Sequence, residues 1–383
     1  MDPILGWARK RQSAIIGLIR EFVECESPSD SPSGLHRFMV LLGESVSDIA
    51  VSQLTPCGAF LCKFRLPGRH ERKTGNLLVL GHADTVWPIG TLKAMPFRRA
   101  RGRLWGPGVL DMKAGLAFFV FAMRALRELD IPVANEVAML VNPDEETGSR
   151  ASRAGTELAA KQSHAVLVLE PGTGLEGKAK TARKGIGAFT LKVRGIAAHA
   201  GIDFANGSSA VVELARQIEV ISGFTDLKRG ITVNPGVVSG GTRSNVIAAE
   251  ASAEIDFRVP RLTDAAVIDR KFRALKPFDK RCSLELTGGL NRPPMERNRG
   301  VAALFAAARR LAADLGVDLE ASATGGGSDG NFTAALGIPT LDGIGAVGEG
   351  AHAAHESILI DRIPDRVALL AKLATESAIS YTA

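Results

Sequence analysis

The stretch Asn76-Leu-Leu-Val-Leu-Gly-His-Ala-Asp84 is a short apolar run that ends in a histidine and an aspartate. Further runs end in Asp111, in the pair Glu145 and Glu146, and in Glu170. Short apolar runs bounded by Gly or Pro are typical of buried strands in a parallel sheet. In open α/β sheets the ligand site lies beyond the carboxyl ends of the strands. Because several carboxylates gathered there need a cation to offset their charge, the sequence predicts a metal site.

Length and composition indicate an ordinary globular protein. The chain has 383 residues, more than one hydrophobic core usually supports, so we expect two domains. The net charge of +6 includes basic clusters at 69–73 and 98–103, which are typical of solvated faces. We expect no nucleic-acid partner, although the positive charge favours anionic small substrates by steering.

The sequence predicts a cytoplasmic protein. Its four cysteines form neither a CxxC pair nor a Cys/His zinc pattern, which indicates buried thiols in a reducing compartment. Apolar residues at helical spacing between Leu5 and Phe22 predict a helix, and Arg20 and Glu21 interrupt the run, so we do not read it as a signal peptide. No unbroken apolar run approaches the length of about 18 residues that a membrane span requires.

The order of the expected elements predicts an α/β fold with an inserted domain. Up to about residue 180, apolar runs alternate with helical patterns such as 112–129, which indicates a mixed, mostly parallel sheet flanked by helices. Between residues 184 and 291 the order becomes βαββαβ, the ferredoxin-like pattern with an antiparallel sheet. Helices predicted at 301–315 and 361–380 return the chain to the first domain. We therefore expect a catalytic domain made of 1–183 and 292–383, and an inserted lid or dimerisation domain made of 184–291.

Each acidic or histidine motif has a structural alternative. His82 and Asp84 suit a metal ligand and the carboxylate that orients it, but a single histidine at a strand end is more often structural. Asp111 precedes a helix, where it can bridge two metal ions or simply cap the helix. Adjacent Glu145 and Glu146 suit a proton acceptor beside a ligand, since a metal lowers the pKa of water toward 7. An acidic loop that caps a helix is the alternative there.

The motifs in this order resemble the dinuclear zinc exopeptidases and amidases that include glutamate carboxypeptidase, acetylornithine deacetylase and succinyl-diaminopimelate desuccinylase. The resemblance covers nearly the whole chain. The motifs that carry it are Gly81-His-Ala-Asp-Thr85, residues 106–115, Glu145-Glu-Thr-Gly148, Glu170, residues 194–201, Ser244-Asn-Val-Ile247, and Gly350-Ala-His352 with Glu356. The run 180–185 and residues 195–201 look most like the glutamate carboxypeptidase branch.

The resemblance implies a zinc-exopeptidase fold and two Zn²⁺ ions, for which Mn²⁺ or Co²⁺ can substitute. By that resemblance His82 and Glu170 bind one ion, and Glu146 and His352 bind the other. Asp111 bridges them, and the peptide bond after it is cis in relatives.

The remaining roles near the metal follow from the same resemblance. Glu145 is the general base and Asp84 orients His82. His355 competes with His352 for the last ligand position, but His352, followed by Glu356, fits the family pattern better.

The inserted domain supplies further expected site residues. His199 matches a lid histidine that relatives send across a dimer interface to polarise the scissile carbonyl, which implies a homodimer. Asn245 and Arg258 match positions that hold the substrate, and Arg292 matches an arginine that reads its terminal carboxylate. The backbone around Gly327, in a glycine-rich loop, can face that carboxylate, although a structural turn explains the loop equally well.

The expected activity is hydrolysis of an amide or peptide bond next to a free carboxylate. A carboxypeptidase that releases C-terminal glutamate or a similar amino acid is the first hypothesis. A deacylase of N-acyl amino acids is the nearest alternative. Under these two hypotheses the partner is a small molecule, either a peptide or an N-acyl amino acid. A binding module of the same fold that has lost catalysis is a distant alternative, because the motifs lack none of the expected metal ligands and retain the expected general base.

Overall fold

The computed structural model describes residues 2–68 and 75–376, so the basic cluster 69–73 lies outside the described residues. The chain divides into two compact units. Unit 1 comprises Met1–Ala182, Arg297–Thr324 and Ser328–Ala383, and unit 2 comprises Arg183–Glu296 with Gly325–Gly327. Within the described residues, no helix combines the length and the apolar character that crossing a membrane requires.

A mixed sheet forms the centre of unit 1. Its strands, in spatial order, are β1 (Ala50–Leu54), β2 (Phe60–Phe64), β6 (Asn135–Asn142), β3 (Gly75–His82), β7 (Ala165–Val168) and β14 (Thr340–Leu341). The four strands from β6 to β14 run parallel, whereas β1 and β2 pair antiparallel at one edge. The predicted mixed, mostly parallel sheet is confirmed.

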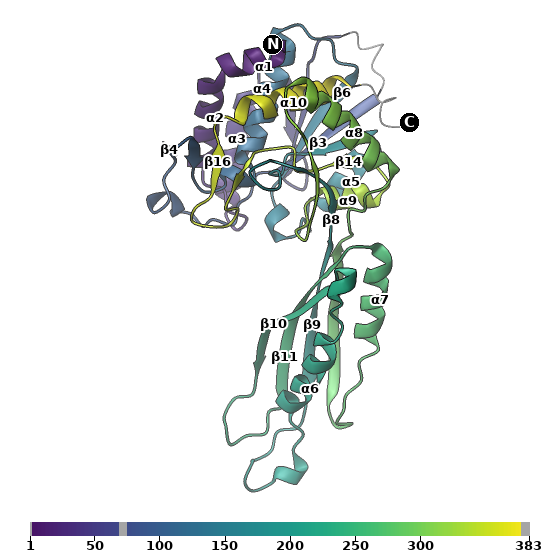
Figure 1. The fold of residues 1–383 in the computed structure, drawn as a ribbon. Coiled ribbons are helices and arrows are strands. Elements are labelled where there is room, and N and C mark those ends of the chain that lie inside the picture. Colours follow the sequence, from purple (N-terminus) through teal and green to yellow (C-terminus); the bar gives the residue numbers. More distant parts are fainter. Residues whose placement is uncertain (1, 69–74, 377–383) are drawn as a thin grey trace. The chain divides into compact units, whose positions relative to one another are not determined.

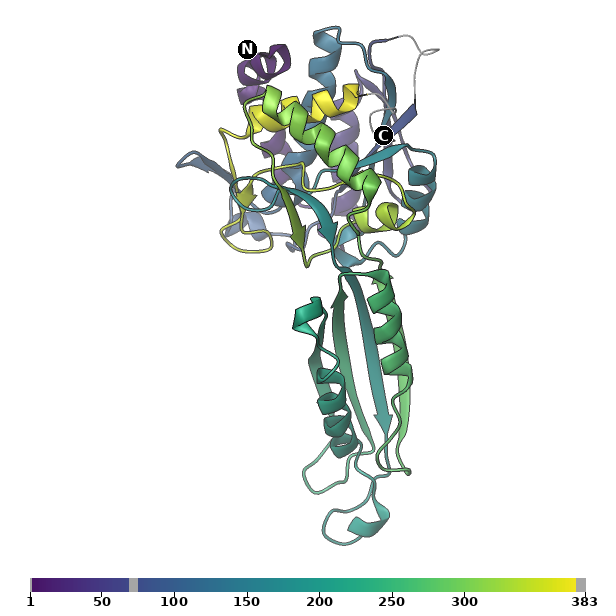
Figure 2. The ribbon, with the colours of Figure 1, turned by 45° about the vertical axis from the view of Figure 1, so that its right-hand side comes forward.

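Both faces of this sheet are buried along β3 and β7, which is why these two strands are nearly continuous apolar runs. Along β3, Leu77 and Val79 join the larger core, while Leu78 and Leu80 join a smaller core that includes α5 residues. Helices therefore cover both faces of the sheet (Figures 1 and 2). The helices of unit 1 are α1 (Pro3–Lys10), α2 (Gln12–Glu24), α3 (Pro32–Val46), α4 (Ala114–Glu128), α5 (Arg153–Lys161), α8 (Arg299–Asp314), α9 (Gly330–Ala335) and α10 (Ile363–Thr375).

Two small sheets complete unit 1. One contains β15 (Gly348–Glu349), β16 (Ser357–Leu359), β5 (Arg103–Trp105) and β4 (Arg98–Ala100), in that order. The other pairs β13 (Ala321–Thr324) with β8 (Ala179–Arg183), whose last residue already belongs to unit 2.

Two helices differ from the sequence prediction. The expected N-terminal helix is divided at Arg11 into α1 and α2, and the side chain of Asp2 caps α1 by accepting from two of its amides. The helix expected from Met112 begins at Ala114, because Asp111 and Met112 have non-helical backbone angles within a wide turn. The peptide bond between these two residues is cis, as the resemblance implied.

Unit 2 has the predicted βαββαβ order. Its elements are β9 (Gly185–Arg194), α6 (Ala210–Ser222), β10 (Thr232–Gly240), β11 (Glu250–Val259), α7 (Leu262–Arg273) and β12 (Ser283–Arg292). The strands form an antiparallel sheet in the order β10-β11-β9-β12, which is the ferredoxin-like order. Apolar side chains alternate along β9, and Phe189 stacks on Phe272 of α7 with ring centroids 4.2 Å apart.

Candidate metal centre

Three neighbouring parallel strands carry the predicted ligands to one edge of the sheet in unit 1. His82 is the last residue of β3, Glu145 and Glu146 follow β6, and Glu170 follows β7. Ligand atoms of His82, Glu145 and Glu170 lie within 4.8 Å of one another, as do those of His82, Asp111 and Glu146. The predicted strand-end cluster therefore exists, and its side chains come from segments far apart in the sequence.

Asp111 lies between the two histidines. Its Oδ1 is 3.2 Å from His82 Nε2, and its Oδ2 is 3.4 Å from His352 Nε2. A carboxylate with one oxygen at each imidazole is arranged to bridge two cations. The N-cap position of α4 is Lys113 and not Asp111, so the alternative reading of Asp111 as a helix cap is not observed.

The spacing of the donor atoms fits a first-row metal. Glu170 Oε1 lies 3.5 Å from His82 Nε2, and Glu146 Oε1 lies 3.2 Å from His352 Nε2. Ligands about 2.0–2.1 Å from a tetrahedral Zn²⁺ are about 3.3–3.4 Å apart. The imidazole and carboxylate donors also suit Zn²⁺, Mn²⁺ and Co²⁺. These residues therefore fit divalent metal ions of this kind.

The charges of the cluster lead to the same conclusion. Burial opposes ionisation of Asp111, but hydrogen bonds from His352 and His82 hold its pKa far below the usual value. Contacts with Asp111 and Glu146 raise the pKa of His352 to about 10, and burial raises the pKa of Glu146. The carboxylates thus hold protons on their histidine neighbours, and a divalent cation would supply that positive charge instead.

Asp84 connects the histidine to the acidic loop. The backbone oxygen of Asp84 is 2.9 Å from His82 Nδ1, and its carboxylate Oδ1 is 3.5 Å from the same nitrogen. The carboxylate also accepts from the backbone amides of Glu145 and Glu146, at 3.1 and 3.0 Å. A hydrogen bond of 2.7 Å from Ser29 Oγ completes its surroundings. Asp84 therefore positions both the histidine and the acidic pair, and the second of these roles was not predicted.

The neighbouring Asp144 has the structural role that was the alternative for the acidic loop. Its carboxylate accepts from Ala151 N at 2.8 Å and from Ser152 Oγ at 2.5 Å, just before α5. Asp144 thus anchors the loop to the start of α5, while the side chains of Glu145 and Glu146 lie in the cluster. Glu170 is only 6% exposed and begins no helix, so it is neither a solvated surface residue nor a helix-start residue.

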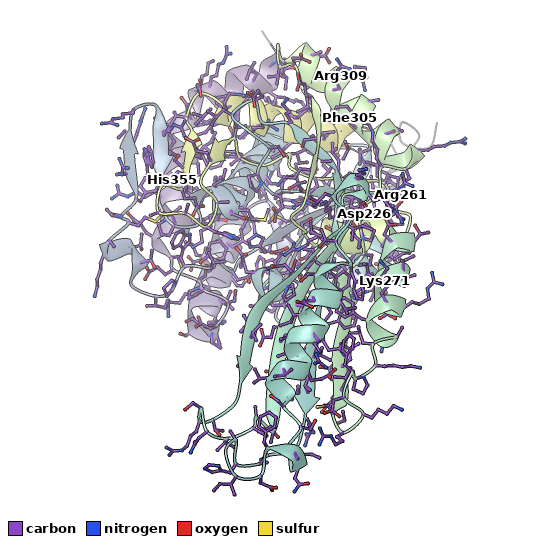
Figure 3. All side chains as sticks on the ribbon, turned by 60° about the horizontal axis from the view of Figure 1, so that its bottom comes forward. Asp226, Arg261, Lys271, Phe305, Arg309 and His355 are labelled. Atoms are coloured by element: carbon purple, nitrogen blue, oxygen red, sulfur yellow. The ribbon has the colours of Figure 1, made fainter. Side chains whose placement is uncertain are left out.

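The structure brings His352 into the cluster but not His355. His352 adopts a left-handed backbone conformation, with φ of 62°, and its Nε2 reaches Asp111 and Glu146. His355, labelled in Figure 3, is exposed and lies next to Gly350.

Two residues at the site carry roles that the sequence analysis did not assign. Glu356, which the family pattern places four residues after His352, is fully buried and accepts four hydrogen bonds around Asp111. Lys180 Nζ lies 3.9 Å from Glu170 Oε2. The only sequence signal for Lys180 is its place in the 180–185 run, which carried no role.

The predicted substrate-binding residues of unit 2 form two separate groups. His199 and Asn245 lie on adjoining segments, joined by a hydrogen bond of 2.9 Å from Ala200 N to Asn245 O. Both side chains are exposed. Arg258 and Arg292 instead flank the same residue of β9, Ile186, at the opposite end of that strand.

The glycine-rich loop belongs to the second group. Arg258 Nη1 donates to Gly325 O at 3.4 Å, and a Cβ added to Gly327 would lie 2.9 Å from Arg292 Cδ. Arg183, which is 4% exposed, donates to the carbonyl oxygens of Gly326 and Gly327. Arg183 therefore holds the glycine-rich loop in place. The sequence around Arg183 did not predict this role.

Two histidines and four carboxylates beyond the carboxyl edge of a mixed sheet define a metallohydrolase. The chain belongs to peptidase family M20/M25/M40, whose family model matches residues 78–376. This confirms the resemblance drawn from the motifs, and it makes the chain a hydrolase of the metallopeptidase class.

Known relatives agree with this assignment. Carboxypeptidase G2 of Pseudomonas sp. (strain RS-16) is 28% identical over 375 residues, which cover 96% of this chain and 90% of the relative. The aminopeptidase PepT of Bacillus cereus has a similar structure, with a TM-score of 0.77 and 21% identity over 95% of this chain and 99% of that one. The YXEP protein of Bacillus subtilis, described as a dinuclear metal-binding peptidase of family M20, has a TM-score of 0.66 and 15% identity over 96% and 98% of the two chains. These structural likenesses establish the fold alone.

Proposed function

We propose that the chain is a cytoplasmic dinuclear zinc hydrolase that releases a C-terminal glutamate, or a similar amino acid, from an amide or peptide. The observation that carries this proposal is Asp111, whose two oxygens face His82 and His352 at 3.2 and 3.4 Å. Support for a carboxypeptidase comes from the likeness to carboxypeptidase G2 over nearly the whole chain.

In this proposal five residues hold the metal. His82 and Glu170 would hold one ion, Glu146 and His352 would hold the other, and Asp111 would be shared between the two. A metal bound there would supply polarisation of the scissile carbonyl and a lower pKa for water at the site. Glu356 and Asp84 keep the ligand-bearing loops in place through the backbone contacts described above.

Glu145 is the proposed general base. Its side chain shares a cluster with His82 and Glu170, and its backbone amide is fixed by Asp84. A carboxylate held there accepts a proton from the attacking water and returns it to the departing amine nitrogen. Because the adjacent Glu146 is a ligand, the two neighbours have separable roles.

The proposed substrate carboxylate binds to Arg292 and Arg258, with the backbone around Gly327. Both arginines lie at the β12 and β11 positions that pair with Ile186. The planar guanidinium group suits a carboxylate, because it donates two parallel hydrogen bonds. This contact selects substrates with a free carboxylate beside the scissile bond.

His199 and Asn245 are proposed to act on the substrate of a partner chain in a homodimer. Arg194 at the end of β9 is separated from Ile186 by eight residues of strand, about 26 Å at 3.3 Å per residue. A small substrate held by Arg292 therefore lies beyond the reach of the His199 in the same unit. A second copy can supply His199, with Asn245 beside it, to polarise the carbonyl.

A substrate panel with metal analysis tests the activity. We expect about two divalent ions per chain and loss of activity with a chelator. Among dipeptides, acyl-glutamates and N-acetyl amino acids, those with C-terminal glutamate should give the highest kcat/KM. Preference for N-acyl groups regardless of the amino acid would favour the deacylase alternative. A metal-free protein with full activity would reject the metal mechanism, and a metal-loaded protein without activity would favour a binding module.

Complementation tests the dimer. A mixture of Glu145→Gln and His199→Ala chains should regain activity, because one of the two composite sites in a mixed dimer is then intact. A confirmed mixed dimer without recovery would reject action across chains.

A further inference from the structure

Asp329 stands at the start of α9 without acting as a cap. It occupies the N-cap position of that helix, where an aspartate usually accepts from the first free amides, yet its side chain makes no such hydrogen bond. Ser328 Oγ accepts from Gly330 N instead, at 3.1 Å. The Asp329 side chain is turned elsewhere in unit 1, although the residue is only 3% exposed.

The two oxygens of Asp329 reach both ends of the acidic loop 143–148. Its Oδ2 accepts from Asn142 Nδ2 at 2.6 Å, and its Oδ1 accepts a short hydrogen bond from Ser149 Oγ. Asn142 is the last residue of β6, and Ser149 directly follows the loop that carries Glu145 and Glu146. One carboxylate therefore clamps the loop where it leaves the sheet and where it ends.

The contacted residues are themselves fixed. Asn142 and Ser149 are fully buried, and the other hydrogen of Asn142 Nδ2 goes to Thr156 Oγ1 at 2.9 Å. The backbone oxygen of Asn142 accepts from Ala83 N at 2.8 Å, in the segment between His82 and Asp84. A shift of Asn142 would therefore affect β6 and β3, two of the three strands that carry residues of the cluster.

Ser149 is the more sensitive of the two ends. It has a left-handed backbone, with φ of 55°, which is unfavourable for a residue other than glycine. Its amide donates to Asp144 O at 2.8 Å, which closes the loop on itself. Loss of Asp329 would remove the acceptor that one N–H of Asn142 and the hydroxyl of Ser149 now share, and the loss of such a contact is costly for buried polar groups.

We propose that Asp329 is a positioning residue, which sets the place of Glu145 and Glu146 by clamping both ends of their loop. It acts through Asn142 and Ser149, in the way that supporting hydrogen bonds orient catalytic groups and metal ligands. The inference rests on the proposed function, because it gives Asp329 a part in placing the proposed base.

The test compares variants of the metal-loaded protein. Asp329→Ala should lower kcat tenfold or more with KM within threefold of wild type, and amide exchange of peptides covering 143–149 should become faster. Asp329→Asn should keep kcat within threefold, because an amide can accept from Asn142 and donate to Ser149 Oγ. The control is Thr333→Ala, on the same helix α9, which removes a buried hydrogen bond of 2.9 Å to Thr340 of β14 but leaves the contacts of the loop in place. It should leave kcat and the exchange of this loop unchanged.

Several results would overturn the proposal. Unchanged loop exchange with kcat within threefold in Asp329→Ala would do so, as would an equal loss of kcat in Thr333→Ala. A higher KM with normal kcat would assign Asp329 to substrate binding instead. If Asp329→Ala does not fold, Ser149→Ala removes one arm of the clamp and should speed loop exchange and lower kcat at least threefold, and normal values would reject the clamp. If the wild-type protein hydrolyses nothing, the proposed function fails, while loop exchange still decides whether the clamp exists.

Discussion

Replacing Glu356 by glutamine should destabilise the protein and loosen the metal site. The Oε1 atom of Glu356 accepts from the amides of Leu110 and Asp111, and Oε2 accepts from the amide of Gly108 and from Trp87 Nε1. These four distances lie between 2.8 and 3.1 Å, and the side chain is fully buried.

Glutamine keeps one of the two accepting oxygens. Its NH₂ group faces two N–H donors whichever way the amide is turned, so two buried donors lose their acceptor. Each such loss costs about 1–3 kcal/mol, so Glu356→Gln should lower the free energy of unfolding by roughly 2–6 kcal/mol. Because one of the affected amides belongs to Asp111, metal affinity should fall as well.

Urea unfolding of metal-free and metal-loaded protein measures the first effect, and competition with a chelator measures the second. Glu349→Gln is the matched control in the same hairpin. Glu349 pairs with Arg103 at 2.6 Å, but its side chain is 49% exposed. An exposed pair contributes about 0–1 kcal/mol, so this variant should stay near wild type. Equal stability of the two variants would refute the reasoning about Glu356.

Three further predictions concern the candidate site and the thiols. Glu145→Gln should retain metal while kcat falls by about two to four orders of magnitude. Glu146→Ala should instead lose metal, and near-normal turnover of the Gln variant would move the base elsewhere. His352→Ala should abolish activity and lower metal occupancy, whereas His355→Ala should have little effect on either, and the reverse ranking would show that the ligand is misassigned. Burial raises the pKa of Cys62 to about 12, so its thiolate fraction at pH 8 is roughly a thousandfold below that of a free thiol, and a disulfide reagent should leave it unlabelled until the protein unfolds.

Local sequence was sufficient for the elements that carry the site. The apolar run before His82 and the run 165–169 contain almost only side chains that are unfavourable in water. They are therefore buried, and they form β3 and β7 as predicted. The positions of their ends follow, because a polar ligand cannot continue a buried strand. The split of the first helix at Arg11 and the wide turn at Asp111 were missed, since apolar spacing alone does not register a one-residue break or a change in backbone angles.

The sequence by itself determined which side chains are available for metal chemistry and at which strand ends they lie. This is because a buried strand is defined by a run of apolar residues that are adjacent in the sequence. Which of them meet is visible only in the tertiary structure, although the family resemblance had already implied the pairing. Asp111 contacts both His82 and His352, and His355 stays outside the cluster, through contacts between residues that lie far apart in the chain.

The supporting residues Glu356 and Asp329 depend on the tertiary structure in the same way. Asp329 reaches residues that precede it by 180 positions or more. In the sequence an aspartate before a short helix is indistinguishable from a cap, since only the fold brings Asn142 and Ser149 to its oxygens. Hydrogen-bond partners of this kind are set by packing, and packing is a property of the whole folded chain.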